Sequence, residues 1–154
     1  MRMSGARGFT LLEILLALTI AVLITAVAIP NFTPLLARAQ LYSAARDIGS
    51  GLRYARGQAM ARGKESEFEL DVHKHFYRVT GRNKAYSLSE QVRLSLFTAD
   101  AEVAGEGVGK IRFYPDGSST GGRVTLDGGG QKRLVDISWL TGEVRIRGED
   151  GEAD

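Results

Sequence analysis

The hydrophobic and polar positions divide the chain into three parts with different periods. Residues 9–29 read FTLLEILLALTIAVLITAVAI, an apolar run in which Glu13 is the only charged side chain. Apolar residues recur at steps of three and four over residues 41–59, and after residue 63 they alternate with polar residues. Periods of 3.6 and 2 are those of helices and strands. The pattern predicts an α+β protein with a long N-terminal helix and a β-rich C-terminal part.

The apolar run is long enough for a membrane span. A helix rises ~1.5 Å per residue, so residues 9–29 would form a helix about 30 Å long, which matches the apolar core of a bilayer. Ahead of it, residues 1–8 (MRMSGARG) are polar and basic and end in Gly8. We therefore expect a leader over residues 1–8 and a transmembrane helix over residues 9–29, with a processing site at their junction.

Two ordinary kinds of N-terminal segment remain as alternatives. A secretory signal peptide would be cleaved at Ala26-Val27-Ala28 and would release the chain from Ile29 onward, although its apolar core is normally only ~7–15 residues long. A plain membrane anchor would leave the chain uncleaved. Both alternatives place the Glu13 carboxylate in the membrane, which costs ~2.5–3.5 kcal/mol on insertion scales unless a cation pairs with it.

The helix is expected to continue beyond the apolar run. Pro30 and Pro34 should kink it rather than end it, because helical periodicity resumes directly after them. The apolar stripe of the second half consists of Leu41, Ala45, Ile48, Leu52, Ala55 and Ala59. The arginines off this stripe are Arg46, Arg53 and Arg56. Residues 30–62 are therefore predicted to form the amphipathic half of the helix, packed on a folded head.

Glycines weaken and then end this amphipathic half. Gly49, Gly51 and Gly57 each cost roughly 1 kcal/mol in an exposed helix, so the helix is expected to need the packing of the head. Gly63 is the expected stop, because glycine commonly follows the last helical residue.

Alternating residues predict strands across a head that comprises residues 63–147. The apolar positions of these strands are Phe68, Leu70 and Val72; Val92, Leu94 and Leu96; Ile111 and Phe113; Val124 and Leu126; Val135, Ile137 and Trp139; and Val144 and Ile146. Turn-forming clusters at residues 115–117, 128–130 and 141–142 separate several of them. The spacing predicts an antiparallel β-sheet or small β-sandwich. The acidic residues 148–154 are expected to form a disordered tail.

The amino-acid composition argues against disulfides, thiolate metal sites and a polyanionic partner. The 154 residues include no cysteine, so the chain can form neither a disulfide nor a thiolate metal site. Lys and Arg number 20 against 18 Asp and Glu, and without the leader residues Arg2 and Arg7 the two totals are equal at 18. The helix over residues 38–64 is basic, with Asp47 as its one acid, but the overall balance gives no reason to expect a polyanion. We therefore expect no nucleic-acid partner.

Two segments contain residue types that bind ligands elsewhere. His73 and His75 have no third or fourth metal ligand near them in the sequence, and they fall where a hairpin turn is expected. Residues 116–122 (DGSSTGG) lack the Gly-Lys-Ser/Thr ending of a phosphate-binding loop, so a structural loop that uses Gly117 and Gly122 is expected. No serine, histidine and acid show catalytic spacing. The sequence predicts no enzyme, no metal site and no cofactor.

The junction at residues 8–13, Gly-Phe-Thr-Leu-Leu-Glu, resembles the cleavage motif of type IV pilins and type II secretion pseudopilins. The resemblance implies that a prepilin peptidase cleaves between Gly8 and Phe9 and methylates the amino group of Phe9. It also gives Glu13, the fifth residue of the mature chain, a role in filament assembly. The Glu13 carboxylate would meet the terminal ammonium of Phe9 in a neighbouring subunit, which would make its burial tolerable.

Two segments of the head narrow this resemblance. Residues 111–126 (IRFYPDGSSTGGRVTL) and 135–146 (VDISWLTGEVRI) are similar to the C-terminal signatures of the minor pseudopilin H group, whereas residues 64–110 match no family signature. The resemblance implies a minor pseudopilin of a type II secretion system, a structural subunit of the periplasmic pseudopilus that drives export of folded proteins. FimT-like minor pilins, which act in pilus priming or DNA uptake, share this domain type and remain the alternative.

The resemblance also implies partners and a location. The partners would be other major and minor pseudopilins, the prepilin peptidase and the bacterial inner membrane, which the chain would cross once with its head in the periplasm. Counting positive charges gives the opposite orientation, because the basic residues after the span outnumber Arg2 and Arg7. The leader motif is the more specific signal, and the basic residues mostly lie beyond the nearest flank of the span.

Overall fold

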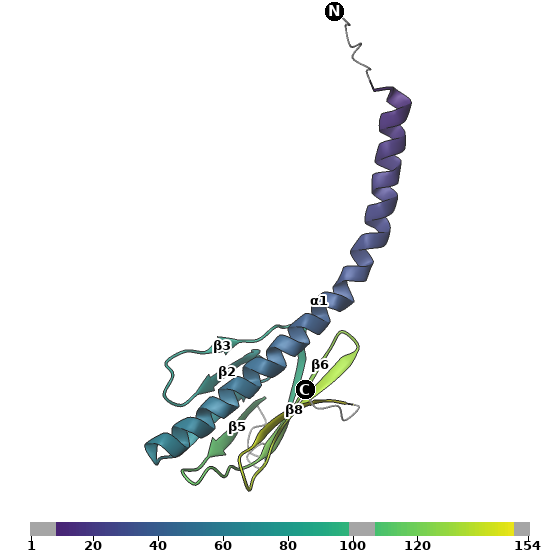
Figure 1. Cartoon of the computed structure of the whole chain (residues 1–154). Coiled ribbons are helices and arrows are strands. Elements are labelled where there is room, and N and C mark those ends of the chain that lie inside the picture. Colours follow the sequence, from purple (N-terminus) through teal and green to yellow (C-terminus); the bar gives the residue numbers. More distant parts are fainter. Residues whose placement is uncertain (1–8, 99–106, 150–154) are drawn as a thin grey trace, which may run out of the picture. The chain divides into compact units, whose positions relative to one another are not determined.

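The computed structural model describes residues 9–98 and 107–149, so the leader over residues 1–8 lies outside it. A single helix, α1 (Leu11–Arg62), precedes the strands of the described chain (Figure 1). These strands are β1 (Ser66–Asp71), β2 (Phe76–Val79), β3 (Tyr86–Ser87), β4 (Arg93–Phe97), β5 (Val108–Phe113), β6 (Gly122–Gly128), β7 (Gln131–Ile137) and β8 (Val144–Gly148). The chain divides into an N-terminal unit that ends at Thr33 and a second unit that begins at Pro34.

The N-terminal unit contains the first part of α1, and the large apolar side chains of residues 9–25 are exposed. Their exposure ranges from 48% at Ile20 to 80% at Phe9. Thr10 caps the helix, because its hydroxyl oxygen accepts a hydrogen bond from the Glu13 N–H at 3.2 Å. The Thr19 hydroxyl bonds to the carbonyl of Leu15 within the same helix. Within the described residues, no helix combines the length and apolar character required to cross a membrane.

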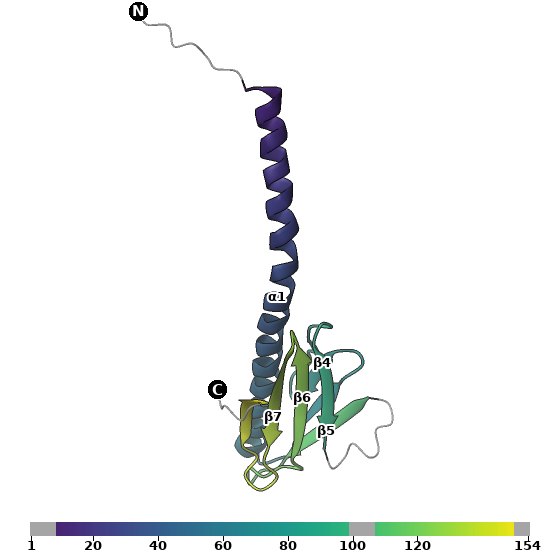
Figure 2. The same ribbon diagram turned by 90° about the vertical axis from the view of Figure 1, so that its right-hand side faces the viewer.

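The second unit is built on two four-stranded antiparallel sheets. The first has the order β3-β2-β1-β5, and the second has the order β4-β6-β7-β8. They meet at the end of β4, where the buried Thr98 hydroxyl lies 3.2 Å from the carbonyl oxygens of both Lys110 and Gly121. The second half of α1 lies on one side of both sheets, as the two perpendicular views show (Figure 2).

The helix and both sheets share one core. The six predicted apolar positions of α1 are all buried: Leu41, Ala45, Ile48, Leu52, Ala55 and Ala59. Facing them are Phe68, Leu70, Ile111 and Phe113 from the first sheet, and Val124, Leu126, Val135 and Ile137 from the second. The predicted α+β fold, with the amphipathic half of a long helix packed on antiparallel strands, is confirmed.

The predicted end of the helix is also confirmed. Gly63 has a φ of 62°, a conformation that side chains other than glycine rarely adopt. The Lys64 N–H donates to the carbonyl oxygen of Ala59 at 3.3 Å, which is the bond pattern of a glycine-terminated helix. α1 continues through Pro30 and Pro34, so these prolines do not end it.

Three details of the predicted strands differ from the structure. Asp71 alternates with the apolar residues Leu70 and Val72 and would face outward in a regular strand, but it is only 4% exposed. Its carboxylate accepts hydrogen bonds from the N–H groups of His73 and Lys74 in the following turn. Trp139 was expected to continue the inward pattern of β7, but that strand ends at Ile137 and Trp139 is 68% exposed. Gly148, expected in the tail, is the last residue of β8, while residues 150–154 lie outside the described chain.

We expect the second unit to fold without residues 1–33, because its core is formed entirely by residues after Pro34. A fragment of residues 34–154 should be soluble and monomeric by analytical ultracentrifugation, and its circular dichroism should show both helix and strand. A fragment that is unfolded or only aggregates would mean that the first part of α1 is needed for folding.

Two helical glycines in this fragment should respond oppositely to alanine. A Cβ at Gly51 would lie 2.8 Å from Tyr77 Cε2 and 2.9 Å from Phe68 Cε2, so Gly51→Ala should destabilise the fragment by about 1–3 kcal/mol. A Cβ at Gly57 would have no neighbour within 4 Å, so Gly57→Ala should stabilise it by about 0.5–1 kcal/mol. Urea unfolding measures both, and equal stabilities would contradict the close packing at Gly51.

Candidate functional site

The histidine pair predicted to lie in a turn does so. His73 and His75 are in the turn between β1 and β2, where His75 has a φ of 50°. The Nε2 atom of His75 lies 3.0 Å from the carbonyl oxygen of Val92, and the other ring nitrogen lies 3.3 Å from the carbonyl of His73. Among the described residues, no group of three or more His, Asp or Glu side chains is arranged to hold a metal ion.

The loop between β5 and β6 has the structural character expected from its glycines and hydroxyls. Asp116 Oδ1 accepts hydrogen bonds from the Ser118 N–H at 2.9 Å and the Ser118 hydroxyl at 2.6 Å, and these bonds hold the pKa of Asp116 below its usual value. Gly117 has a φ of 88°, and Gly122 has a φ of 149° with the Phe97 carbonyl 2.7 Å from the position of a Cβ. Both glycines therefore adopt conformations that other residues resist.

The two head segments that carry the family resemblance pack against each other through this loop. The Ser119 N–H donates to the carbonyl of Trp139 at 2.9 Å, and the Ser119 hydroxyl donates to the carbonyl of Ser138 at 3.0 Å. On the helix side, Arg56 Nε donates to the Gly117 carbonyl at 3.2 Å. The loop after β5, the turn after β7 and the helix are therefore joined at one end of the unit.

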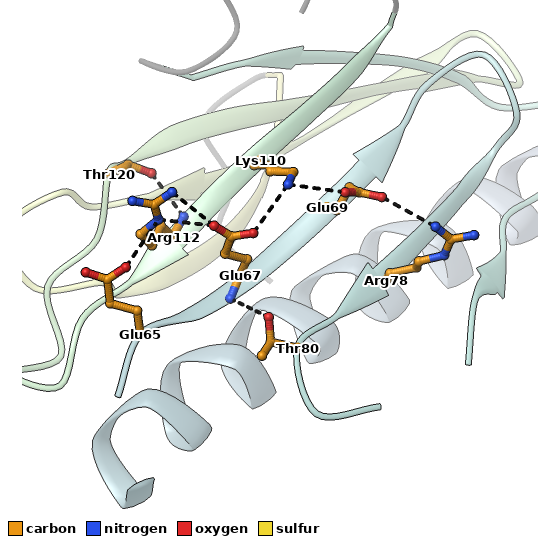
Figure 3. A network of polar contacts seen from close by, with 8 residues as sticks. All are labelled: Glu65, Glu67, Glu69, Arg78, Thr80, Lys110, Arg112 and Thr120. Atoms are coloured by element: carbon orange, nitrogen blue, oxygen red, sulfur yellow. Dashed lines mark hydrogen bonds and ion pairs between the residues drawn. The ribbon is translucent and has the colours of Figure 1, made fainter. Parts of the chain in front are cut away.

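Charged side chains cover the outer face of the first sheet and neutralise one another (Figure 3). Glu67 Oε1 accepts from Arg112 Nη2 at 3.0 Å, while its other carboxylate oxygen lies 3.4 Å from Lys110 Nζ. Lys110 also pairs with Glu69 at 3.6 Å, and Arg78 pairs with Glu69 at 3.8 Å. The Glu67 carboxylate raises the pKa values of Lys110 and Arg112. Partly exposed pairs stabilise little individually, and this face retains no strong excess of one charge.

The outer face of the second sheet is different, because it mixes aromatic and arginine side chains. Strand pairing places Phe97, Arg123, Asp136 and Arg145 in one row across β4, β6, β7 and β8. These residues line a groove of about 880 Å³, where Phe97 is 78% exposed and Asp136 pairs with Arg123. Exposed aromatic and arginine residues are typical of protein interfaces. This face is therefore a candidate surface for contact with another subunit.

The pattern of apolar and polar residues does not reveal this row. Phe97 occupies a polar position in the alternating pattern of β4, so its outward direction can be read from the sequence. The residues beside it on the neighbouring strands depend on the strand register, which the sequence does not show. Trp139 and Leu140 in the turn after β7 are also exposed, at 68% and 64%. Their exposure is visible only once the end of β7 is known.

The residues predicted to act in processing and assembly lie at the N-terminus of α1. Gly8 lies outside the described residues. Phe9 is 80% exposed, and Glu13 is an exposed residue of the first helical turn. Both belong to the N-terminal unit, so neither is part of the core of the second unit.

Comparison with known proteins identifies the family. Residues 44–142 match the family model described as type II transport protein GspH. The type II secretion system protein H of Xanthomonas campestris pv. campestris is 33% identical over 139 residues, which cover 90% of this chain and 82% of that protein. The chain belongs to the GspH family. The resemblance to pseudopilins inferred from the sequence is thus confirmed.

Solved structures share the fold of this GspH-family chain. The type IV minor pilin FimU of Pseudomonas aeruginosa aligns with a TM-score of 0.57 at 14% identity, covering 76% of this chain and 94% of FimU. The minor pseudopilin EpsH from the type 2 secretion system of Vibrio cholerae aligns with a TM-score of 0.56 at 13% identity. The alignment covers 71% of this chain and 97% of EpsH. At these identities the structures show a common fold and nothing narrower.

Proposed function

We propose that this chain is a minor pseudopilin of a type II secretion system, a structural subunit of the periplasmic pseudopilus that drives export of folded proteins. The observation that carries the proposal is its 33% identity, over 90% of its length, to a protein named type II secretion system protein H. The row of Phe97 and arginines on the second sheet supports a role in subunit contact. The family relationship favours a structural protein over an enzyme.

The N-terminal unit is proposed to anchor the subunit before assembly. Residues 1–8 are the leader, residues 9–29 lie in the bacterial inner membrane and the head, residues 63–147, lies in the periplasm. The apolar sequence of residues 9–29, in which Glu13 is the only charge, supports this assignment. The exposed large apolar side chains of residues 9–25 support it too, because they require lipid or other helices to cover them. Prepilin peptidase, the inner membrane and companion pseudopilins are the proposed partners.

Glu13 is proposed to fix the position of the subunit in the filament. Its carboxylate is costly within an apolar environment unless a cation is close, and cleavage leaves a cation on the mature chain, the terminal ammonium of Phe9. A pair between Glu13 of one subunit and Phe9 of the next would remove two unpaired charges at once. Methylation of Phe9 leaves that ammonium charged, so the pair is compatible with the proposed modification.

A minor pilin of a type IV pilus, acting in pilus priming or DNA uptake, is the second candidate. The shared fold with FimU favours it, although fold alone does not separate pilins from pseudopilins. Gene neighbourhood distinguishes the two, because secretion and pilus operons contain different companions. The curated relative named for type II secretion makes the first candidate the stronger one.

Processing should occur between Gly8 and Phe9, and the intact mass of the mature chain should correspond to an N-methylated Phe9. Gly8→Ala should be processed more efficiently than Gly8→Leu, because a pocket that accepts glycine excludes large side chains first. A mature chain that begins at Ile29 would establish a secretory signal, and an uncleaved chain would establish a plain anchor. Equal processing of both Gly8 variants would contradict the proposed pocket.

Removal of the Glu13 charge should separate membrane insertion from assembly. Glu13→Leu should insert and be cleaved normally, because it removes an unpaired charge from the membrane form, but crosslinking to companion pseudopilins and secretion of a reporter exoprotein should fall. Both are measured in a strain that lacks the native gene.

Two controls make the Glu13 experiment specific. Thr10→Ala removes the helix cap but keeps the carboxylate, so it should retain assembly better than Glu13→Leu. Glu13→Gln keeps the shape of the side chain without its charge and should resemble Glu13→Leu. Wild-type crosslinking and secretion by both Glu13 variants would refute the pairing role.

A further inference from the structure

A row of residues on α1 borders a groove beside strand β8. Arg38, Tyr42, Arg46, Gly49 and Arg53 follow one another at steps of four, four, three and four, which places them on one face of the helix. The groove has a volume of about 420 Å³ and is lined by Tyr42, Ala45, Arg46, Arg53 and Ile146. Its position is fixed by close packing, because a Cβ at Gly49 would lie 2.9 Å from Ile146 Cδ1.

The strand that borders this groove has an open edge. β8 is the last strand in the order of the second sheet and pairs only with β7 among the described strands. The Ser138 N–H donates to the Glu143 carbonyl, so the alternation of an antiparallel ladder directs the backbone groups of Arg145 and Arg147 toward β7. The backbone groups of Ile146 and Gly148 then point to the open side.

A contact from the helix agrees with this alternation. Val144 precedes Ile146 by two residues, and its carbonyl oxygen accepts a hydrogen bond from Arg53 Nη2 at 3.4 Å. The side chain of Arg53 therefore reaches the same edge to which Ile146 and Gly148 present their N–H and C=O groups. Within the described residues, no hydrogen bond satisfies these groups of Ile146 and Gly148.

The groove is also positively charged. Arg46 and Arg53 line it and form no ion pair within residues 9–98 and 107–149, in contrast to the basic residues of the first sheet. A further guanidinium, that of Arg133, stacks 4.1 Å from the ring centre of Tyr42. Gly148 pairs with Arg133 across the β7–β8 ladder, so this cation lies beside the open strand as well.

We propose that this groove binds an extended acidic segment of a neighbouring pseudopilin by strand addition to β8. Backbone groups of the segment would bond to Ile146 and Gly148, and its carboxylates would pair with Arg46 and Arg53. Ile146 and Ala45 give the groove an apolar part of its lining. Every second side chain of the bound strand would point toward this lining and could be apolar. The identity of the neighbour as a pseudopilin rests on the proposed function.

The combination of features favours a peptide over a nucleic acid. A phosphate backbone would use the arginines, but it would leave the amide and carbonyl groups of Ile146 and Gly148 without partners. An acidic strand satisfies both sets of groups. The chain has its own acidic residues after Glu149, namely Asp150, Glu152 and Asp154, and the experiment therefore includes their removal as a separate arm.

The test measures binding of a labelled peptide of alternating Glu and Val residues to the full mature chain in detergent micelles. Arg46→Glu should weaken binding by about tenfold or more, because it replaces attraction by repulsion at a desolvated contact. The matched control is Arg93→Glu, which makes the same change of charge on the exposed side chain of β4. It should alter the affinity by no more than about twofold, as expected for a distant surface charge.

Modified peptides test strand addition without altering the protein. N-methylation of the amides on one edge of the peptide should abolish binding, and N-methylation on the other edge should leave it intact, because only one edge bonds to β8. Equal binding of both modified peptides would overturn strand addition. Equal effects of Arg46→Glu and Arg93→Glu would overturn the assignment of the groove.

Two further arms identify the occupant. If the peptide binds only after residues 150–154 are deleted, the groove belongs to the chain's own acidic segment and the proposal of a neighbour is wrong. If a DNA duplex binds with higher affinity than the peptide and Arg46→Glu removes that binding, the occupant is a nucleic acid. A wild-type chain that restores secretion but does not bind the peptide refutes this inference alone, whereas failure to restore secretion refutes the proposed function.

Discussion

The burial of one helical stripe against two separate sheets is the interaction on which the second unit depends. The sheets are not continuous with each other, and both contribute their inner faces to the core that the stripe from Leu41 to Ala59 completes. Close approach requires a bare backbone at Gly51, where Phe68 and Tyr77 leave no room for a Cβ. Once this packing fixes the helix, the arginines beside the stripe reach defined strand and loop carbonyls. Arg53 and Arg56 therefore hold the helix to strand β8 and to the loop after β5 by hydrogen bonds, in addition to lying at the surface.

The N-terminal unit contributes no residue to this core. The large apolar side chains of residues 9–25 are exposed, which is unfavourable in water, so groups from outside the subunit must cover them. Under the proposed function, that cover is first lipid and then the helices of other subunits. Cleavage after Gly8 would remove the basic leader and, by the same step, create the ammonium of Phe9 that Glu13 needs. Processing and assembly competence would thus be linked by electrostatics rather than by a change in fold.

Periodicity predicted the elements whose burial repeats regularly, which are the helical stripe, its end at Gly63 and most of the strands. It did not predict the role of Gly51, because the cost of a helical glycine is local whereas the ring that requires it, Tyr77, belongs to a later strand. Trp139 was misplaced because hydrophobicity alone does not show where β7 turns. Gly8, Phe9 and Glu13 came from a motif, and only Phe9 and Glu13 are within the described residues. The row at Phe97 depends on strand register and is absent from any sequence pattern.

The outer surfaces of the second unit differ in whether their charges are satisfied. On the first sheet Glu67 and Glu69 each contact basic residues, so that face is complete without a partner. Beside β8, Arg46 makes no ion pair among the described residues, and folding gives no reason for a cation at that position. The strand next to it presents backbone groups that a soluble protein normally protects from unintended pairing. Charge and an open edge at the same place restrict what can bind, because a ligand must be both acidic and able to pair as a strand. A subunit surface with these two requirements would select its neighbour more strictly than charge attraction alone.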